Sequence, residues 1–192
     1  MLPLADLRVV DLTEALAGPY AAMLLGDLGA DVIKIERPGS GDQSRRWGAR
    51  LPNGESAYFC ATNRNKRSLT LNIQAAAGQD VLYRLLAGAD VFLCNIPRED
   101  SLRRAGLDWP TLHARFPRLI FGSITGYGRT GPYAGRSGYD LVAQFHTPIT
   151  VGPLQVSDLT GTAAWGRAPD VPNLPANPLN PSDKATLMLN PP

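Results

Sequence analysis

Few residues of this sequence fall into the common catalytic motifs. It contains no G-x-S-x-G nucleophile elbow and no Walker A loop. The two histidines, His113 and His146, lie far apart, which argues against a histidine-based metal site, and a structural role is expected for His113 in a short amphipathic helix. Cys60 and Cys94 lack C-x-x-C spacing, so we expect small buried apolar side chains rather than a disulfide or a zinc site.

A glycine-rich segment at residues 126–131 (GYGRTG) matches the dinucleotide-binding pattern G-x-G-x-x-G. That pattern binds a pyrophosphate only where it opens a helix, because the helix N-terminal amides contact the phosphates. Pro132 and Gly135 follow at once, and a helix does not continue easily through them. We therefore expect neither a nicotinamide nor a flavin site here.

The more informative polar residues follow apolar runs. Residues 12–19 (LTEALAGP) read as a strand-to-helix turn, and ligands of open α/β sheets bind at such turns. Arg37 follows another apolar run in the turn at residues 36–39 (ERPG), and residues 63–68 (NRNKRS) form a cationic segment for which a solvated loop is the alternative. Of the 19 basic residues 16 are arginine, which suits a phosphate or carboxylate ligand, although a GC-rich genome would produce the same bias.

Strands and helices are predicted to alternate along the first three quarters of the chain. A helix is expected between Gly18 and Gly29, with Pro19 at its first position. The other predicted helices are residues 75–88 and 108–116, and the predicted strands are residues 7–12, 31–36, 68–72, 90–95 and 119–125. This alternation predicts an α/β fold with a Rossmann-like, doubly wound and mostly parallel sheet.

The pattern changes after Gln144. The last 48 residues hold nine of the 17 prolines, and proline is excluded from regular helices and central strands. We expect residues 1–144 to form one domain and residues 145–192 to be an irregular Pro-rich tail, which a truncation or a frameshift would explain.

Bulk properties narrow the partners and the location. No run approaches the roughly 20 apolar residues of a membrane span, and the N-terminus lacks the features of a signal peptide. The cytoplasm is therefore the expected location, with no membrane partner. The net charge of +2 gives no reason to expect nucleic acid as a partner.

Together these segments resemble the N-terminal portion of a family III CoA-transferase of the CaiB/BaiF type. The matching stretches are residues 7–19 (LRVVDLTEALAGP), 26–42 (GDLGADVIKIERPGSGD), 58–72 (YFCATNRNKRSLTLN), 89–95 (ADVFLCN), 106–107 (GL), 117–127 (PRLIFGSITGY) and 131–144 (GPYAGRSGYDLVAQ). The resemblance covers three quarters of this chain and about half of a typical family member, and several motifs in the family's order make it specific.

The resemblance implies coenzyme A, or its acyl thioester, as the ligand, with no metal. The positions that match the family's CoA contacts are Leu16, Ala17, Arg37, Leu71, Asn72, Ile73, Gln74, Asn95, Ile96, Arg104, Tyr139 and Asp140. Most of them are loop positions at the carboxyl ends of predicted strands. The chain departs from the family between Asn95 and Leu102, where its turn is one residue longer than the usual Phe-Arg-Pro-Gly type, and this departure falls on Ile96.

The resemblance also implies acyl-CoA:carboxylate CoA transfer through an aspartate nucleophile and an acyl-aspartyl anhydride. The segment at residues 151–161 (VGPLQVSDLTG) matches the local spacing around that nucleophile, which makes Asp158 the candidate catalytic residue. Asp158 nevertheless comes about eleven residues earlier than in the family, and the usual glycine-rich run before it is missing. An unrelated tail aspartate is therefore the alternative.

Two other functions stay open. Racemases of the family move an α-proton with a His-Asp pair, and here the His position is Tyr139, whose phenol (pKa near 10) matches that task poorly. The other alternative is an inactive CoA-binding fragment, which the Pro-rich tail and the partial coverage suggest. The resemblance implies a homodimer for full-length members and leaves the oligomeric state of this chain open.

Overall fold

The computed structural model describes residues 2–134, Arg136, Gly138 and the backbone of three short later strands. The chain divides into two compact units, Met1–Tyr139 and Asp140–Pro192. The domain boundary expected after Gln144 stays a prediction.

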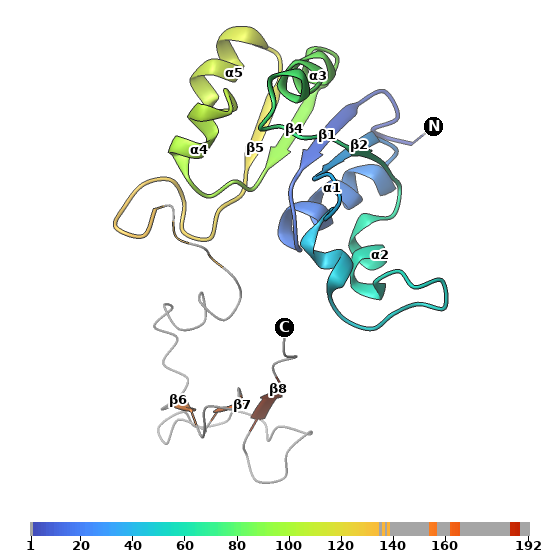
Figure 1. Ribbon diagram of the computed structural model, residues 1–192, viewed down its shortest axis with the longest axis vertical. Helices are drawn as coiled ribbons and strands as arrows, with labels where there is room; N and C mark the ends of the chain where they lie inside the picture. The colour runs from blue at the N-terminus through green and yellow to red at the C-terminus, as the bar shows by residue number, and fades with distance from the viewer. Residues whose placement is uncertain are drawn as a thin grey trace. The chain divides into compact units, whose positions relative to one another are not determined.

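The first unit is built on a five-stranded, all-parallel sheet with the strand order β3-β2-β1-β4-β5 (Figure 1). Its strands are β1 (Arg8–Leu12), β2 (Asp31–Glu36), β3 (Lys66–Thr70), β4 (Val91–Cys94) and β5 (Ile120–Ser123). The helices are α1 (Ala17–Asp27), the 3-10 helix η1 (Gln43–Arg46), α2 (Ala57–Asn63), α3 (Ala76–Ala87), α4 (Glu99–Arg104) and α5 (Trp109–Arg115). The predicted α/β fold with a parallel, Rossmann-like sheet is confirmed.

Helices cover both faces of this sheet, with α1 and α2 on one side and α3, α4 and α5 on the other (Figure 1). Neighbouring strand residues point to opposite faces, because the side-chain period of a strand is two. Val9 therefore packs in the cluster beneath α1, and Val10 packs in the larger cluster with Leu82 of α3 and Leu112 of α5. Burial on both faces explains the near-continuous apolar runs of β1 and β4.

Most predicted elements agree with the structure within two residues, and β2 agrees at both ends. The predicted start of the first helix at Pro19 was wrong. α1 begins at Ala17, because the carbonyl of Leu16 already accepts a hydrogen bond from the Tyr20 amide (2.8 Å). Proline is tolerated in this first turn because the amides there have no partner within the helix.

The prediction for the third strand was shifted by two residues, and α2 and η1 were not predicted. β3 runs over Lys66–Thr70, so the predicted contacts Leu71 and Asn72 lie in the turn after it. α2 is short, and it begins where the Ser56 hydroxyl accepts a hydrogen bond from the Phe59 amide (3.1 Å).

The second unit contains a separate antiparallel sheet in the order β6-β7-β8. Its strands are β6 (Leu154–Val156), β7 (Thr162–Trp165) and β8 (Ala185–Met188). These strands were not predicted within the Pro-rich tail. The most proline-dense part, residues 169–181, lies outside the described residues.

The strand order places the switch point of the first sheet between β1 and β4. After β1 the chain continues to β2 and β3 on one side, and it then crosses back to β4 and β5 on the other. The connections that leave β1 and β4 therefore diverge, and the carboxyl ends of these strands are where open α/β sheets bind ligands.

Candidate functional site

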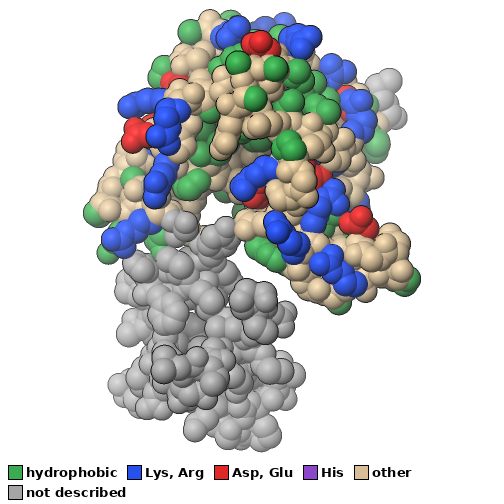
Figure 2. Space-filling view, in the orientation of Figure 1, with side chains coloured by type: hydrophobic (Ala, Val, Ile, Leu, Met, Phe, Trp, Pro, Cys, Tyr) green, Lys and Arg blue, Asp and Glu red, His purple; other side chains and the backbone are tan. Residues whose placement is uncertain are grey.

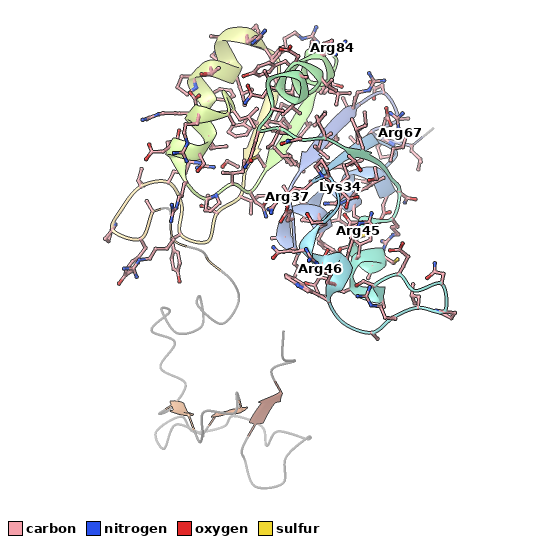
Figure 3. All side chains as sticks on the ribbon, in the orientation of Figure 1. Lys34, Arg37, Arg45, Arg46, Arg67 and Arg84 are labelled. Atoms are coloured by element: carbon pink, nitrogen blue, oxygen red, sulfur yellow. The ribbon has the colours of Figure 1, made fainter. Side chains whose placement is uncertain are left out.

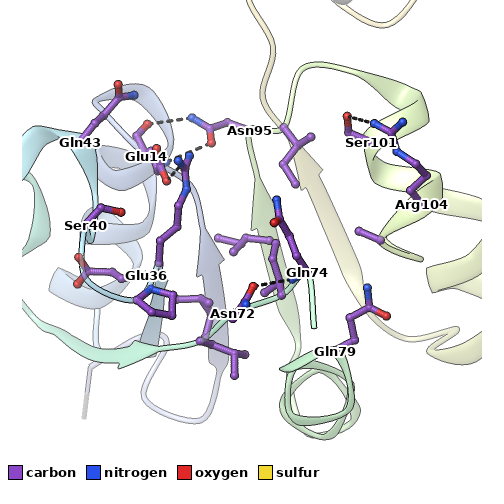
Figure 4. Close-up of a pocket in the computed structure, with 18 of the residues that line it drawn as sticks. Glu14, Glu36, Ser40, Gln43, Asn72, Gln74, Gln79, Asn95, Ser101 and Arg104 are labelled. Atoms are coloured by element: carbon purple, nitrogen blue, oxygen red, sulfur yellow. Dashed lines mark hydrogen bonds and ion pairs between the residues drawn. The ribbon is translucent and has the colours of Figure 1, made fainter. Parts of the chain in front are cut away.

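A cavity of about 910 Å³ lies at this switch point (Figure 4). Its wall comes from the carboxyl ends of β1, β2 and β4, from the turn between β3 and α3, and from α4. The lining residues are Leu12, Glu14, Ile35, Glu36, Arg37, Pro38, Ser40, Gln43, Leu71, Asn72, Ile73, Gln74, Gln79, Asn95, Ile96, Pro97, Ser101, Arg104 and Ala105. A volume of this size is near the upper end of the range for small-molecule sites and suits one of the larger ligands of that class.

Glu14 connects the three strand ends at the top of the cavity (Figure 4). The Asn95 side chain accepts a hydrogen bond from the Glu14 amide (3.1 Å) and donates one to the Glu14 carbonyl (2.8 Å). The Glu14 carboxylate in turn forms an ion pair with the Arg37 guanidinium (2.8 Å). The turn after β1 is therefore held to the residues that follow β4 and β2.

Two buried lysines, each paired with a buried aspartate, hold the same turn in place. Lys34 Nζ lies 2.8 Å from Asp42 Oδ2 and donates to the carbonyl of Thr13 (2.8 Å), and Lys66 Nζ lies 2.9 Å from Asp11 Oδ2. Asp42 also accepts a hydrogen bond from the Ala15 amide (3.2 Å), and Ala15 adopts a left-handed φ of 73°. These contacts hold the turn in a conformation that alanine rarely adopts.

Glu36 anchors the β2 side of the cavity. Arg45 donates to both of its carboxylate oxygens (2.7 and 2.8 Å). The Glu36 carboxylate also accepts hydrogen bonds from the Ser68 hydroxyl (2.6 Å) and the Asp42 amide (3.0 Å). Burial alone would raise the pKa of Glu36, but these hydrogen bonds outweigh it and lower the pKa to about 2. Glu36 is therefore a fixed anion that orders the turn after β2.

The turn between β3 and α3 forms the floor. The Asn72 side chain accepts a hydrogen bond from the Gln74 amide (3.0 Å), and its carbonyl accepts one from the Ala75 amide (3.2 Å). Gly78 of α3 packs so closely under this turn that a Cβ there would overlap the Asn72 carbonyl. The shape of the floor thus depends on a glycine.

Two arginines, Arg37 and Arg104, line the cavity on different walls. Arg37 follows β2, whereas Arg104 lies on α4, where it donates to the Ser101 hydroxyl (3.3 Å). Figure 2 shows basic side chains both over α4 and near the end of β2. Arg67 and Arg84 lie away from Arg37 in Figure 3, and neither lines the cavity.

Eight of the predicted contacts come together around this one cavity: Arg37, Leu71, Asn72, Ile73, Gln74, Asn95, Ile96 and Arg104. Leu16 and Ala17 are exposed at the start of α1 and do not line it. Tyr139, Asp140 and Asp158 lie outside the described residues. The structure therefore places eight of the twelve predicted contacts together, and their role as CoA contacts stays a prediction.

Sequence reasoning missed several lining residues, among them Glu14, Ser40, Gln43, Gln79 and Ser101. Glu14 stands in a turn that the sequence singled out, but its main partner Asn95 lies 81 residues away. No local pattern indicates that pairing.

Other sequence predictions concern residues outside this cavity. Residues 124–134 after β5 form bends and turns, so the glycine pattern opens no helix among the described residues. His113 is exposed on α5 and stacks on Trp109 (4.8 Å between ring centroids), which agrees with a structural role. Cys94 is fully buried, as expected. Cys60 is only partly buried, contrary to the expectation, because α2 buries only its last two residues, Thr62 and Asn63. Arg64 is an exposed residue paired with Asp27 (2.6 Å).

The described part of the chain holds no group of three or more His, Cys, Asp or Glu residues arranged to bind a metal ion. None of its helices combines the length and the apolar character needed to cross a membrane.

The cavity is equipped for binding an elongated polar ligand. Asparagine and glutamine side chains offer donors and acceptors along its wall, and two guanidinium groups suit phosphates or an aromatic ring. Its two carboxylates, Glu14 and Glu36, are both engaged with arginines.

Comparison with known proteins assigns a family to this architecture. The profile of CoA-transferase family III matches residues 4–152. The chain belongs to this family. The resemblance noted in the sequence is thereby confirmed.

Several relatives are similar over most of the chain. Succinyl-CoA:glutarate CoA-transferase of Mus musculus is 49% identical over 179 residues, covering 86% of this chain and 41% of that protein. The succinyl-CoA–L-malate CoA-transferase beta subunit of Chloroflexus aurantiacus is 41% identical, covering 83% and 42%. The crystal structure of a CAIB/BAIF family protein from Brucella suis superposes with a TM-score of 0.67 at 47% identity, covering 72% and 37%. The chain thus spans about two fifths of the length of these relatives.

Proposed function

We propose that this chain provides the CoA-binding part of an acyl-CoA:carboxylate CoA-transferase and that CoA occupies the cavity at the switch point. The observation that carries the proposal is the convergence of eight predicted CoA contacts, from four separate segments, on one cavity of about 910 Å³. These residues are far apart in the sequence, so their convergence does not follow from local structure.

The chemistry of the cavity supports a nucleotide-bearing ligand. Arg37 and Arg104 are suited to the phosphates and the adenine ring, because a guanidinium can both pair with an anion and stack on an aromatic plane. The apolar residues Leu71, Ile73 and Ile96 line the same cavity and suit the less polar pantetheine arm.

For the substrates we propose succinyl-CoA as the donor and a short dicarboxylic acid as the acceptor. This rests on the relatives whose names specify succinyl-CoA with glutarate or with L-malate. In the proposed reaction an aspartate carboxylate attacks the thioester carbonyl and CoA departs as the thiolate. The held CoA thiolate then attacks the aspartyl carbonyl of this anhydride, which releases succinate and leaves an aspartyl-CoA thioester. The acceptor carboxylate attacks that thioester, forming a second anhydride and freeing the CoA thiolate. The thiolate finally attacks the acceptor's acyl carbonyl, so that the new acyl-CoA leaves and the aspartate carboxylate is regenerated. Asp158 is the candidate for this aspartate, and the alternative is that Asp158 is an unrelated aspartate of the tail with no part in catalysis.

The proposed location is the cytoplasm. The family resemblance implies a homodimer for full-length members and leaves the oligomeric state of this chain open. Light scattering on the purified chain measures that state directly.

A transfer assay tests the proposed reaction. The chain is incubated with succinyl-CoA and glutarate, L-malate or acetate, and new thioesters are identified by mass spectrometry. We expect glutaryl-CoA or malyl-CoA to form faster than acetyl-CoA, and loss of turnover in Asp158→Ala would identify the nucleophile. CoA binding without any transfer would instead support the alternative of a non-catalytic CoA-binding protein.

A further inference from the structure

Glu14 forms an ion pair with Arg37, one of the predicted ligand contacts. Its carboxylate lies 2.8 Å from the Arg37 guanidinium, and Arg37 is one of only two basic residues among those that line the cavity. The Arg37 side chain is 70% exposed and that of Glu14 is 23% exposed, so the pair sits where an incoming ligand can reach it.

An anionic ligand at Arg37 meets this carboxylate. A phosphate has to share the guanidinium donors with Glu14 or replace it, and it brings a second negative charge close to the first. Asn95 adds to the conflict, because both of its side-chain hydrogen bonds go to the backbone of Glu14 and hold that residue in place. The Glu14 backbone is therefore fixed, and its carboxylate stays within a side chain's length of Arg37.

We propose that Glu14 is an affinity-determining residue that competes with phosphate-bearing ligands for Arg37. The proposal rests on the proposed function, since it assumes that the ligand in this cavity is anionic. Glu14 weakens the binding of such a ligand, and this opposes retention of CoA or its thioesters at the site.

The charged groups around Glu14 set the pH range of this competition. They are Arg37 from the turn after β2, Lys34 from β2 and Asp42 from the turn before η1. Burial and Asp42 raise the pKa of Glu14, while Arg37 and Lys34 partly offset them. Competition is therefore complete above this raised pKa and is lost as the pH falls through it, because a neutral carboxyl group no longer pairs with Arg37.

The test compares Glu14→Gln with the wild-type chain by calorimetry at low ionic strength, with CoA and inorganic pyrophosphate as separate probes. We expect Glu14→Gln to bind both probes about twofold to fivefold more tightly at pH 7, the range for a partly exposed ion pair. The gain should vanish in an Arg37→Gln background, and the ratio of the two affinities should approach one as the pH is lowered. Since the ligand's own titration is common to both proteins, it cancels in this ratio.

The matched control is Asp27→Asn. Asp27 is similarly exposed (26%) and pairs with Arg64 at 2.6 Å, but neither residue lines the cavity. Asp27→Asn removes the same unit of charge as Glu14→Gln, but away from the cavity. We therefore expect the affinities for CoA and for pyrophosphate to stay unchanged in this control. An equal gain in this control would mean that net charge alone is responsible, and the proposal would be wrong.

The outcomes separate this proposal from the proposed function. If Glu14→Gln binds the probes no more tightly than wild type, or binds them more weakly, Glu14 is not a competitor. If CoA binds neither protein while pyrophosphate binds Glu14→Gln more tightly, the CoA proposal fails and the competition stands. If neither probe binds either protein, both proposals fail.

Discussion

Replacing Lys34 with methionine should destabilise the first unit strongly, because Lys34 is a buried charge with buried partners. Its side chain is 1% exposed, it pairs with the fully buried Asp42 at 2.8 Å, and it donates to the carbonyl of Thr13. Methionine retains most of the volume but leaves the Asp42 carboxylate without its counter-ion. Breaking a buried pair in this way costs about 3–5 kcal/mol of unfolding free energy.

The double variant Lys34→Met/Asp42→Asn separates the lost pair from the lost side chain. Asparagine keeps an oxygen that can accept from the Ala15 amide and from Ser44, and it removes the unpaired charge. We therefore expect the double variant to be less destabilised than the single one, by about 1–3 kcal/mol, because removing both partners avoids the desolvation penalty of an orphaned charge.

Urea unfolding followed by circular dichroism measures these differences, with Arg8→Met as the control for an exposed pair. Arg8 lies 3.2 Å from Asp31, but their side chains are 49% and 36% exposed, so its loss should cost less than about 1 kcal/mol. If Lys34→Met costs no more unfolding free energy than Arg8→Met, the buried pair does not hold the turn after β1.

Three further predictions concern other parts of the unit. Glu36→Gln should cost up to about 3 kcal/mol above pH 5, since the pKa of Glu36 falls from 4.5 to about 2 on folding, and this difference should disappear as the pH falls from 4.5 to 2 in urea titrations. Gly78→Ala should weaken CoA binding about tenfold in calorimetry, because its Cβ displaces the Asn72 carbonyl at the cavity floor. Cys94 should resist thiol reagents in the native chain while Cys60 reacts, since burial raises the pKa of the Cys94 thiol to about 11.

Each of these has a result that contradicts it. A Glu36→Gln difference that stays constant down to pH 2 would mean that the native carboxylate is not stabilised by its hydrogen bonds. Unchanged CoA affinity in Gly78→Ala would mean that the floor does not contact the ligand. Modification of both cysteines at similar rates in the native chain would mean that Cys94 is accessible.

The strands that could be predicted best from the sequence are those whose side chains are buried on both faces of the sheet. β2 was predicted with its observed bounds, because an apolar run ending in Glu36 and followed by a fixed turn has few alternatives. β3 was harder, because its sequence KRSLT is polar and the burial of Lys66 depends on distant partners. The Lys66 side chain is 2% exposed, and its ammonium group donates to Asp11 of β1, to Asn63 and to the Pro19 carbonyl. Such a pairing between distant residues leaves no periodic signal.

The candidate site likewise contains residues that could be predicted from the sequence and contacts that could not. Residues at strand ends, such as Arg37 and Asn95, could be predicted from the resemblance and from the rule that ligands bind at switch points. The engagement of Arg37 by Glu14 and the close approach of Gly78 to Asn72 depend on the three-dimensional course of two loops. These contacts arise only once the sheet has assembled.

The central claim is that CoA binds in the cavity at the switch point, and titration calorimetry of CoA into the purified chain tests it most directly. We expect saturable binding by the wild type and an affinity at least about tenfold lower in Arg37→Ala/Arg104→Ala, since each of the two substitutions removes a charge-assisted contact. The matched double variant Arg67→Ala/Arg84→Ala, outside the cavity, should bind like the wild type. Heat no different from dilution at millimolar CoA, or equal binding by both double variants, would contradict the account.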